Sequence, residues 1–231
     1  MTKTIVVVGA GKTIGLSVAR EFGRHGFNVG LIARSADNLR DLREALATDV
    51  VGARVETCLA DVTKANELNI ALDWMREQFG SIDVLEYSPA IGFQNYKPAL
   101  DIDTEGARYA FDLLVGGAVT AVRNVLPEML ERKDGALLFT SGGAALNPIP
   151  FLANVGLVSA GLRNYLTNLH NALAPQGVYV GAIYVGGVMK RGSEVDPDKI
   201  AAKFFEMYSK RDKAEDVVIG PPPPGGPPPK P

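Results

Sequence analysis

The chain has 231 residues, of which 46% are hydrophobic, and its 24 Lys and Arg residues nearly balance its 26 Asp and Glu residues, giving a formal net charge of −2. A chain of this length can bury a large core within one domain. The small net charge gives no electrostatic reason to expect nucleic acid or an anionic membrane as a partner. Cys58 is the one cysteine, which excludes an intrachain disulfide and fits a reducing compartment.

The start of the chain predicts its location. Met1, Thr2 and Lys3 directly precede an apolar segment, so we expect no signal peptide. We also expect no apolar run long enough to span a bilayer. The cytoplasm is therefore the default location.

Predicted strands and helices alternate along the chain. Apolar, β-branched runs bounded by turn residues predict strands at 5–8, 28–33, 54–59, 82–87, 136–140, 178–184 and 216–219. Helical periodicity predicts helices at 16–22, 37–48, 64–79, 104–130, 151–173 and 197–209. This alternation is typical of an α/β protein with a parallel sheet covered on both faces. We predict a single-domain Rossmann fold over residues 1–219, a doubly wound sheet of about seven strands with helices on both faces.

The last residues, 220–231, consist almost entirely of proline and glycine. Such a composition neither pairs in a sheet nor continues a helix. We predict a disordered or polyproline extension, and a proline-rich docking ligand is the alternative.

A glycine-rich turn, Gly9-Ala10-Gly11-Lys12-Thr13-Ile14-Gly15, joins the first predicted strand to the first predicted helix. Glycines let the backbone turn tightly and approach a ligand, and the helix N-terminus points free N–H groups at a phosphate. The position between a strand and a helix favours a dinucleotide cradle over a tight turn without a ligand, the alternative that the glycines alone leave open. The loops after the other strands should lie at the same edge of the sheet.

Several segments, in order, resemble the short-chain dehydrogenase/reductase family. The glycine turn resembles the family's Thr-Gly-x-x-x-Gly-x-Gly, Asp61-Val62-Thr63 its adenine-contacting Asp-Val pair, and Ile82-Asp83-Val84-Leu85 the strand before its Asn-Asn-Ala-Gly segment. Residues 125–129 and 173–178 are also typical of it. The resemblance covers residues 3–219 and implies a nicotinamide cofactor. It implies cofactor contacts at Gly9, Gly11, Lys12, Thr13, Ile14, Gly15, Arg34, Ser35, Asp61, Val62, Ser88, Ala90, Gly186 and Val188.

Two basic residues indicate which cofactor. Arg34 follows the second predicted strand, where an acidic residue would hold a free ribose 2′-hydroxyl. An arginine there favours a 2′-phosphate instead, and Ser35 adds a hydroxyl. Lys12 stands where the family's NADP users often carry a basic residue. We expect NADP(H) rather than NAD(H), with two solvated surface charges as the alternative.

The catalytic relay of the family is an Asn, a Ser, a Tyr and a Lys, and this chain departs from it. Ser141 matches the serine, which implies a catalytic role in holding a substrate carbonyl. The other positions hold Leu114 for the asparagine and Asn154 and Val158 for the tyrosine and lysine, or Val155 and Ser159 if the register shifts by one. Asparagine is no acid near neutral pH, and valine has no charge with which to lower a neighbour's pKa.

Other residues depart from the family pattern or offer replacement chemistry. Thr13 replaces a glycine of the turn, and Tyr87-Ser88-Pro89-Ala90 replaces Asn-Asn-Ala-Gly. Tyr96, on the loop after the fourth predicted strand, and Tyr184, at the end of the sixth, are candidate proton donors, with packing or surface positions as the alternative. His25 and His170 do not suggest a base near the nicotinamide. No spacing suggests a metal site.

Three functions remain open at this stage. The first is an NADP(H)-dependent oxidoreductase of a carbonyl or hydroxyl compound, in which Ser141 polarises the carbonyl and Tyr96 or water supplies the proton. The second is a catalytically inactive relative that binds NADP(H) as a sensor or structural ligand. The third is an interaction domain that has lost the cofactor. The family usually forms a homodimer or homotetramer through helices that correspond to 104–130 and 151–173, and we expect the same here.

Overall fold

The computed structural model describes residues 2–221. The sheet contains seven parallel strands in the order β3-β2-β1-β4-β5-β6-β7. Their bounds are Thr4–Val8 (β1), Asn28–Ala33 (β2), Val55–Leu59 (β3), Val84–Tyr87 (β4), Gly135–Gly142 (β5), Val178–Gly186 (β6) and Glu215–Ile219 (β7). The predicted single-domain Rossmann fold with a doubly wound parallel sheet is confirmed. The predicted Pro/Gly tail, apart from its first two residues, lies outside the described part.

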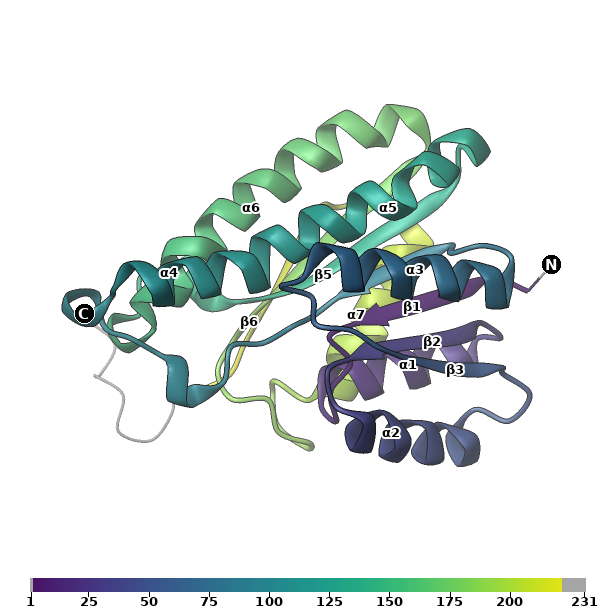
Figure 1. Cartoon of the computed structure of the whole chain (residues 1–231), viewed down its shortest axis with the longest axis horizontal. Coiled ribbons are helices and arrows are strands. Elements are labelled where there is room, and N and C mark those ends of the chain that lie inside the picture. The colour runs from purple at the N-terminus through teal and green to yellow at the C-terminus, as the bar shows by residue number, and fades with distance from the viewer. Residues whose placement is uncertain (1, 222–231) are drawn as a thin grey trace.

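Helices cover both faces of the sheet (Figure 1). Their bounds are Ile14–Arg24 (α1), Ala36–Asp49 (α2), Ala65–Phe79 (α3), Thr104–Phe111 (α4), Gly117–Arg132 (α5), Ala153–Leu173 (α6) and Pro197–Lys210 (α7), with short 3-10 turns in the loops. Helices α1, α2 and α7 pack on one face, and α3, α5 and α6 pack on the other. The helices therefore shield the sheet from water on both sides, as the apolar strands require.

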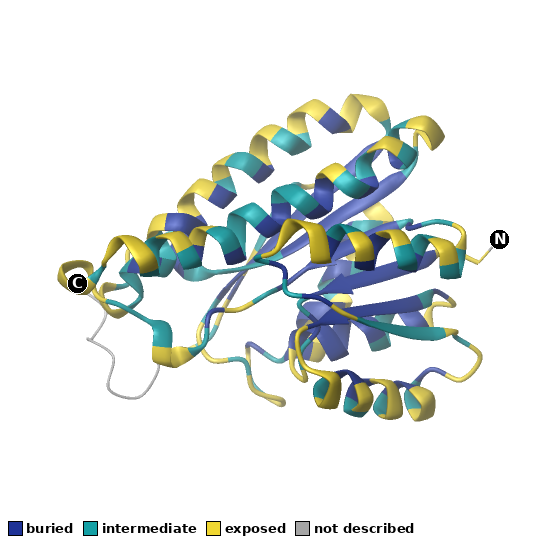
Figure 2. Ribbon diagram, in the orientation of Figure 1, coloured by how far each residue is buried: buried dark blue, intermediate teal, exposed yellow. Residues whose placement is uncertain are grey.

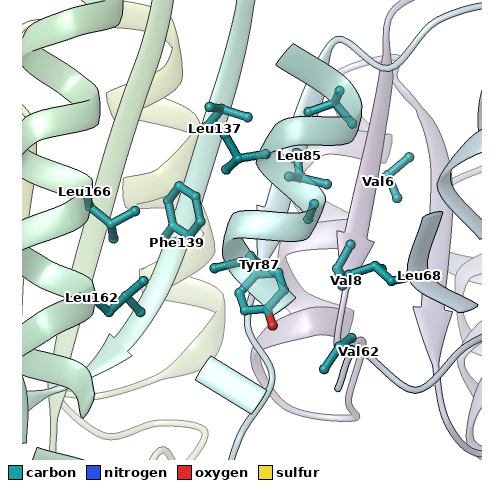
Figure 3. Packing of buried hydrophobic residues seen from close by; sticks show 14 of the residues in the cluster. Val6, Val8, Val62, Leu68, Leu85, Tyr87, Leu137, Phe139, Leu162 and Leu166 are labelled. Carbon is teal, nitrogen blue, oxygen red and sulfur yellow. The ribbon is translucent and has the colours of Figure 1, made fainter. Parts of the chain in front are cut away.

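Two apolar cores result from the alternation of side chains along each strand. On β1, Val6 and Val8 face the α3, α5 and α6 layer, whereas Ile5 and Val7 face the α1, α2 and α7 layer, and all four are fully buried. Figure 3 shows Val8 and Phe139 packed in the first core. In Figure 2 the central strands are buried, the edge strand β3 is largely of intermediate exposure, and the outer helix faces are exposed. Burying each such side chain contributes about 1.5–3 kcal/mol.

The predicted helix 104–130 is not a single α-helix. A π-helical turn, Asp112–Gly116, separates α4 from α5, and the helical stretch continues to Arg132. Tyr87 supports this turn, because its Oη donates to the carbonyl oxygen of Leu113 at 2.6 Å. Gly117 leaves the space for that hydroxyl, since a Cβ atom at this position would overlap Tyr87 Oη.

The same stretch, Thr104–Arg132, is 29 residues long and reaches a mean hydropathy of 1.3, enough to cross a membrane by length and composition alone. The expectation that no apolar run is long enough to do so is therefore wrong on that measure. In the fold, α5 packs against α3 and the sheet, and Arg76 of α3 donates to Asn124 of α5 at 2.9 Å. Core helices and membrane spans share this composition.

The strand order creates the crevice in which ligands bind to such sheets. From β1 the chain moves outward to β2 and β3, and then returns to place β4 on the other side of β1. The loops after β1 and β4 therefore diverge at the carboxyl edge of the sheet. This is where the glycine turn and residues 88–91 meet.

Candidate functional site

Two adjoining cavities lie at this edge. The turn cavity, about 350 Å³, is lined by the glycine turn, by the ends of β2 and β3 and by the loop after β4. The Ser141 cavity, about 240 Å³, is lined by the ends of β5 and β6, by α6 and by the same loop. Ile14, Ser88, Pro89 and Ala90 line both, so the two cavities form one continuous cleft.

The glycine turn is shaped by close backbone contacts. Gly9 has a φ of +82°, and a Cβ atom there would lie 2.5 Å from the backbone nitrogen of Pro89. A Cβ on Gly15 would lie 2.9 Å from the Cα of Ala10, so this glycine lets α1 pack on the turn. At Gly11 no protein atom would lie within 4 Å of a Cβ, which leaves open space beside the turn.

The N-terminus of α1 points at this space with free donors. Thr13 precedes the helix, but its side chain caps no backbone N–H. The amides of Ile14 and Gly15 donate to no acceptor within residues 2–221. Free amides at a helix N-terminus carry the positive end of the helix dipole and suit an anion.

The predicted phosphate-binding residues differ in their surroundings. Arg34 lines the turn cavity, is exposed, and has no ion-pair partner among the described residues. Lys12 does not line the cavity, and its Nζ lies 2.6 Å from Asp41 Oδ2, which lowers the pKa of that carboxyl. Ser35 lines the cavity and its Oγ accepts from the Asn38 amide at 3.2 Å, capping α2.

Asn38 itself is a cavity residue that sequence reasoning missed. It lines the turn cavity, and its Nδ2 donates to the carbonyl oxygen of Ala10 at 2.8 Å. This bond ties the start of α2 to the glycine turn. The signal in the sequence was the Ser-x-x-Asn spacing at the start of a helix, which resembles a capping motif.

Of the remaining predicted cofactor residues, Val62, Ser88, Ala90 and Gly186 line one or both cavities. Asp61 lines neither. Burial raises the pKa of its carboxyl, but hydrogen bonds from the Thr63 backbone N–H at 3.0 Å and from its hydroxyl at 2.8 Å, together with the charges of Arg34 and Lys64, outweigh this effect, so that the pKa falls. Gly15 and Val188 also line neither cavity, although Gly187 and Met189 line the Ser141 cavity.

The wall of the Ser141 cavity decides between the two registers for α6. Ser141, at the end of β5, lines the cavity together with Val155 and Ser159. Asn154 turns away, because its side chain accepts from the Lys97 N–H at 3.0 Å and donates to the Asn95 carbonyl at 2.8 Å. Val158 is buried in the core beneath α6. The structure therefore places Val155 and Ser159, and not Asn154 and Val158, at the cavity.

Leu114, the residue at the predicted asparagine position, lines the Ser141 cavity from the π-helical turn. Ser159 Oγ is buried there without a hydrogen-bond partner among the described residues. No Asp, Glu, Lys, Arg or His side chain of the described chain lines this cavity. Its walls are apolar, with a few hydroxyl groups.

The fold places one candidate tyrosine at the Ser141 cavity and the other in the core. Tyr96 lines the Ser141 cavity, and burial raises the pKa of its hydroxyl. Tyr184 lines neither cavity; it is fully buried, and burial raises its pKa. His170 hydrogen-bonds to the Val180 carbonyl at 2.8 Å, and His25 stacks on Phe205. Within residues 2–221 no group of His, Cys, Asp and Glu side chains is arranged to hold a metal.

Glu86 is the polar residue that sequence reasoning missed most clearly. It lies in β4, is fully buried, and accepts hydrogen bonds from Ser88 Oγ and Thr140 Oγ1, each at 2.8 Å. Burial raises the pKa of its carboxyl to about 7, although both hydroxyls favour the ionised form. A glutamate inside the apolar run Val84-Leu85-Glu86-Tyr87 was the signal, because carboxyls are seldom fully buried.

Comparison with known proteins agrees with this geometry. Residues 3–196 match the short chain dehydrogenase family, and the chain belongs to this family of oxidoreductases. The oxidoreductase UcpA of Salmonella typhimurium is 27% identical, over 94% of this chain and 84% of that protein. The 3-oxoacyl-[acyl-carrier-protein] reductase FabG of Staphylococcus epidermidis is 24% identical, over 95% of this chain and 88% of that protein.

Solved structures share the fold. L-sorbose reductase from Gluconobacter frateurii, complexed with NADPH and L-sorbose, has a TM-score of 0.84 at 21% identity, covering 95% of this chain and 96% of that one. An NADPH-bound short chain oxidoreductase from Pseudomonas aeruginosa PAO1, described as containing an atypical catalytic center, has a TM-score of 0.84 at 19% identity, covering 95% and 97%.

Proposed function

We propose that the protein binds NADP(H) across the two cavities and transfers hydride between this cofactor and an uncharged carbonyl or hydroxyl compound at a non-standard site. The observation that carries the proposal is the Arg34 guanidinium on the turn cavity, which has no ion-pair partner within residues 2–221, together with the free amides at the start of α1, whose first residue, Ile14, lines the same cavity. A guanidinium and helix amides are the donors that phosphate groups prefer. Several structures of the same fold are NADP(H) complexes, which supports this choice.

In this proposal the glycine turn and the α1 N-terminus hold the pyrophosphate, and Arg34 and Ser35 hold the 2′-phosphate. Val62 and Ala90 border the adenosine half. Lys12 contributes less than Arg34, because it is already paired with Asp41 at 2.6 Å. Asp61 and Gly15, which line neither cavity, shape the backbone around the site, Asp61 through its bonds to Thr63 and Gly15 by letting α1 pack on the glycine turn.

The cofactor, when bound, supplies or accepts the hydride. The chain must position the substrate and handle the proton. Ser141 is the residue placed to donate a hydrogen bond to a substrate carbonyl, since its hydroxyl lies at the cavity where β5 ends. The absence of charged side chains from the wall favours an uncharged, largely apolar substrate.

The site is non-standard because the relay positions at the cavity hold Leu114, Val155 and Ser159 instead of asparagine, tyrosine and lysine. None of these three side chains titrates near neutral pH or carries a charge. The Pseudomonas aeruginosa protein described as having an atypical catalytic center is a precedent within the fold. A catalytically inactive relative that binds NADP(H) is the second candidate, and the same three residues favour it.

Isothermal titration with NADPH and NADH tests the cofactor assignment. We expect NADPH to bind more tightly, and Arg34→Ala to weaken NADPH binding by about tenfold to 100-fold while NADH binding changes little, because charge-assisted hydrogen bonds contribute about 1.5–3 kcal/mol. Lys12→Ala is the matched control, with a smaller loss. An equal loss for both nucleotides in Arg34→Ala would contradict the 2′-phosphate contact.

Two double variants test the active-site register. Val155→Tyr with Ser159→Lys places the family's residue types at the cavity, and we expect it to raise NADPH-dependent reduction of simple aldehydes and ketones. Asn154→Tyr with Val158→Lys breaks the bonds to the Lys97 segment and buries a lysine, so we expect loss of stability and no gain. A gain in the second variant alone would contradict the register. NADPH binding without turnover in the wild type would favour the inactive relative.

We also propose a homodimer or homotetramer in the cytoplasm. Phe111 of α4 and Leu157 of α6 are 50% and 60% exposed, which supports burial of this side by a second copy. The free Cys58 thiol is compatible with a reducing compartment. Light scattering tests the assembly, and a monomer at micromolar concentration would contradict it.

A further inference from the structure

Glu86 is the one acidic or basic side chain that is fully buried among the described residues, and it lies under the cleft. Its neighbours in the sheet are Val7 on β1 and Leu138 on β5. Within residues 2–221 its side chain has two polar partners, the hydroxyls of Ser88 and Thr140, one on each carboxyl oxygen. An ionised carboxyl that is fully buried without a neighbouring cation costs free energy, so burial favours the neutral acid.

Both hydroxyls reach from this carboxyl to the cleft. Ser88 and Thr140 line the Ser141 cavity, and Ser88 also lines the turn cavity. Ser88 therefore stands at the junction between the cofactor half and the substrate half of the proposed site. Each hydroxyl is one hydrogen bond of 2.8 Å from the carboxyl. A proton on Glu86 is thus separated from the cleft by a single hydroxyl group.

The hydrogen-bond directions depend on that proton. An ionised carboxyl only accepts, so both hydroxyls donate to it and offer lone pairs to the cleft. A protonated carboxyl donates one hydrogen, which turns the recipient hydroxyl toward the cleft as a donor. When that hydrogen lies on Oε2, the carboxyl oxygen bonded to Ser88, the neutral acid makes Ser88 a hydrogen-bond donor toward a bound ligand.

No charged group competes for the carboxyl. Of the three helices on this face, α1 carries Arg20, α2 carries Asp49 and α7 carries Asp198, and Arg20 pairs with Asp198 at 3.5 Å. Arg20 also pairs with Asp49, and Arg191, which precedes α7, pairs with Asp198. The raised pKa of Glu86 arises from burial, opposed only by the two hydroxyls, and no Coulombic contribution accompanies them. The ion pairs therefore do not hold Glu86 in its charged form.

We propose that Glu86 is the proton donor of the Ser141 cavity and that Ser88 carries its proton to the oxygen of an uncharged carbonyl compound bound there. This inference rests on the proposed function, because the hydride must come from NADPH. Hydride addition at the carbonyl carbon moves the π pair to oxygen, which takes the Ser88 hydrogen. Ser88 takes the Glu86 hydrogen, the carboxylate regains a proton from water, and NADPH is oxidised as the carbonyl is reduced.

Tyr96 is the competing hydroxyl in the same cavity. Burial raises its pKa above 10, the ordinary tyrosine value, whereas the pKa of Glu86 is about 7, so Tyr96 is the weaker acid. A general acid works best with a pKa near the working pH. Glu86 meets this condition and Tyr96 does not.

Difference infrared spectroscopy of the wild type against Glu86→Gln isolates the Glu86 carboxyl without any ligand. We expect a protonated-carboxyl band at pH 6 that disappears as the pH rises through about 7. Thr140→Val removes a hydrogen bond that favours the ionised Glu86 carboxyl, so the pKa of Glu86 should rise and the protonated-carboxyl band of this variant should persist to higher pH. Absence of the band at pH 6 would overturn the proposal whether or not NADPH binds.

Steady-state reduction of uncharged aliphatic and aromatic aldehydes and ketones by NADPH then tests the transfer of the proton from Glu86 through Ser88. We expect Glu86→Gln and Ser88→Ala to lower kcat by about 100-fold, the usual contribution of a general acid, and Glu86→Gln to leave the KM for NADPH little changed. The wild-type kcat should fall as the pH rises through about 7, since the acid is then ionised. In Thr140→Val this fall should move to higher pH, with a smaller loss of kcat than in Ser88→Ala.

The outcomes separate the proposal from the function on which it rests. Wild-type protein that binds NADPH but reduces none of the probes contradicts the oxidoreductase function itself. Wild-type turnover that survives in Ser88→Ala, or that is lost equally in Thr140→Val, contradicts Ser88 as the carrier. Turnover lost in Tyr96→Phe and retained in Glu86→Gln assigns the proton to Tyr96 and overturns the proposal.

Discussion

Replacing Glu86 by glutamine should change how the stability of the protein depends on pH. In the folded protein, burial raises the pKa of this carboxyl to about 7, from the ordinary value of 4.5 expected in the unfolded chain. The folded state therefore binds the proton more tightly. This stabilising contribution is fully present below about pH 4.5 and is lost as the pH rises through about 7.

The magnitude follows from the size of the shift. A shift from 4.5 to about 7 corresponds to about 3 kcal/mol of folding free energy, at 1.36 kcal/mol for each pKa unit. Glutamine keeps the shape of the side chain and does not ionise. The free energy of unfolding of Glu86→Gln should therefore rise relative to the wild type, by up to about 3 kcal/mol between pH 5 and pH 8.

Urea denaturation at half-unit pH steps measures this difference. Glu44→Gln, an exposed glutamate on α2, is the matched control and should leave the pH dependence of the wild type unchanged. A difference between Glu86→Gln and the wild type that is already present at pH 5 is compatible with the reasoning, because glutamine also changes the hydrogen bonds with Ser88 and Thr140; the reasoning requires this difference to change as the pH rises. Unfolding free energies that run parallel from pH 5 to pH 8 would refute it.

The glycine turn offers a matched pair of further variants. Gly9→Ala should destabilise the protein by about 1–3 kcal/mol in thermal denaturation, because alanine would have to adopt a positive φ and its Cβ would clash with Pro89. Gly11→Ala should change stability little, because its Cβ would meet no protein atom. The same Cβ would enter the space proposed for the pyrophosphate, so Gly11→Ala should weaken NADPH binding in calorimetry. Tyr87→Phe should cost about 1–2 kcal/mol in urea denaturation by leaving the Leu113 carbonyl unpaired, and wild-type stability would argue against this bond. Asn154→Ala should loosen the segment around Lys97, seen as faster amide hydrogen exchange there, and unchanged exchange would contradict its holding role.

Much of the site was predictable because its residues are contiguous in the sequence. The turn from Gly9 to Gly15 predicted a strand, a tight turn and a helix N-terminus, and the structure confirms all three. Arg34 directly follows the second predicted strand, and the carboxyl ends of parallel strands meet at the edge of the sheet where ligands bind, so its place at the cleft was predictable. Ser141 was found in the same way, at the end of β5.

Features that depend on helix rotation or on cross-strand contacts were not predictable. Counting from Ser141 could not decide whether Asn154 or Val155 faces the cavity, because the loop before α6 sets the rotation of the helix. The π-helical turn at Asp112–Gly116 depends on a hydrogen bond from Tyr87, which is distant in sequence. The partner of Lys12, Asp41, is likewise distant in sequence and lies on α2.

The sequence by itself determined the parallel α/β fold, the glycine turn and the carboxyl edge where ligands bind, because apolar periodicity and turn residues act over short stretches of chain. Only the tertiary structure decided that Val155 and Ser159 face the Ser141 cavity and that Glu86 lies buried beneath it between two hydroxyls. Those relations join β4, β5 and α6, whose relative rotation and register are set by packing of the whole core. The chemistry of the cleft therefore follows from contacts between segments that local sequence patterns do not connect.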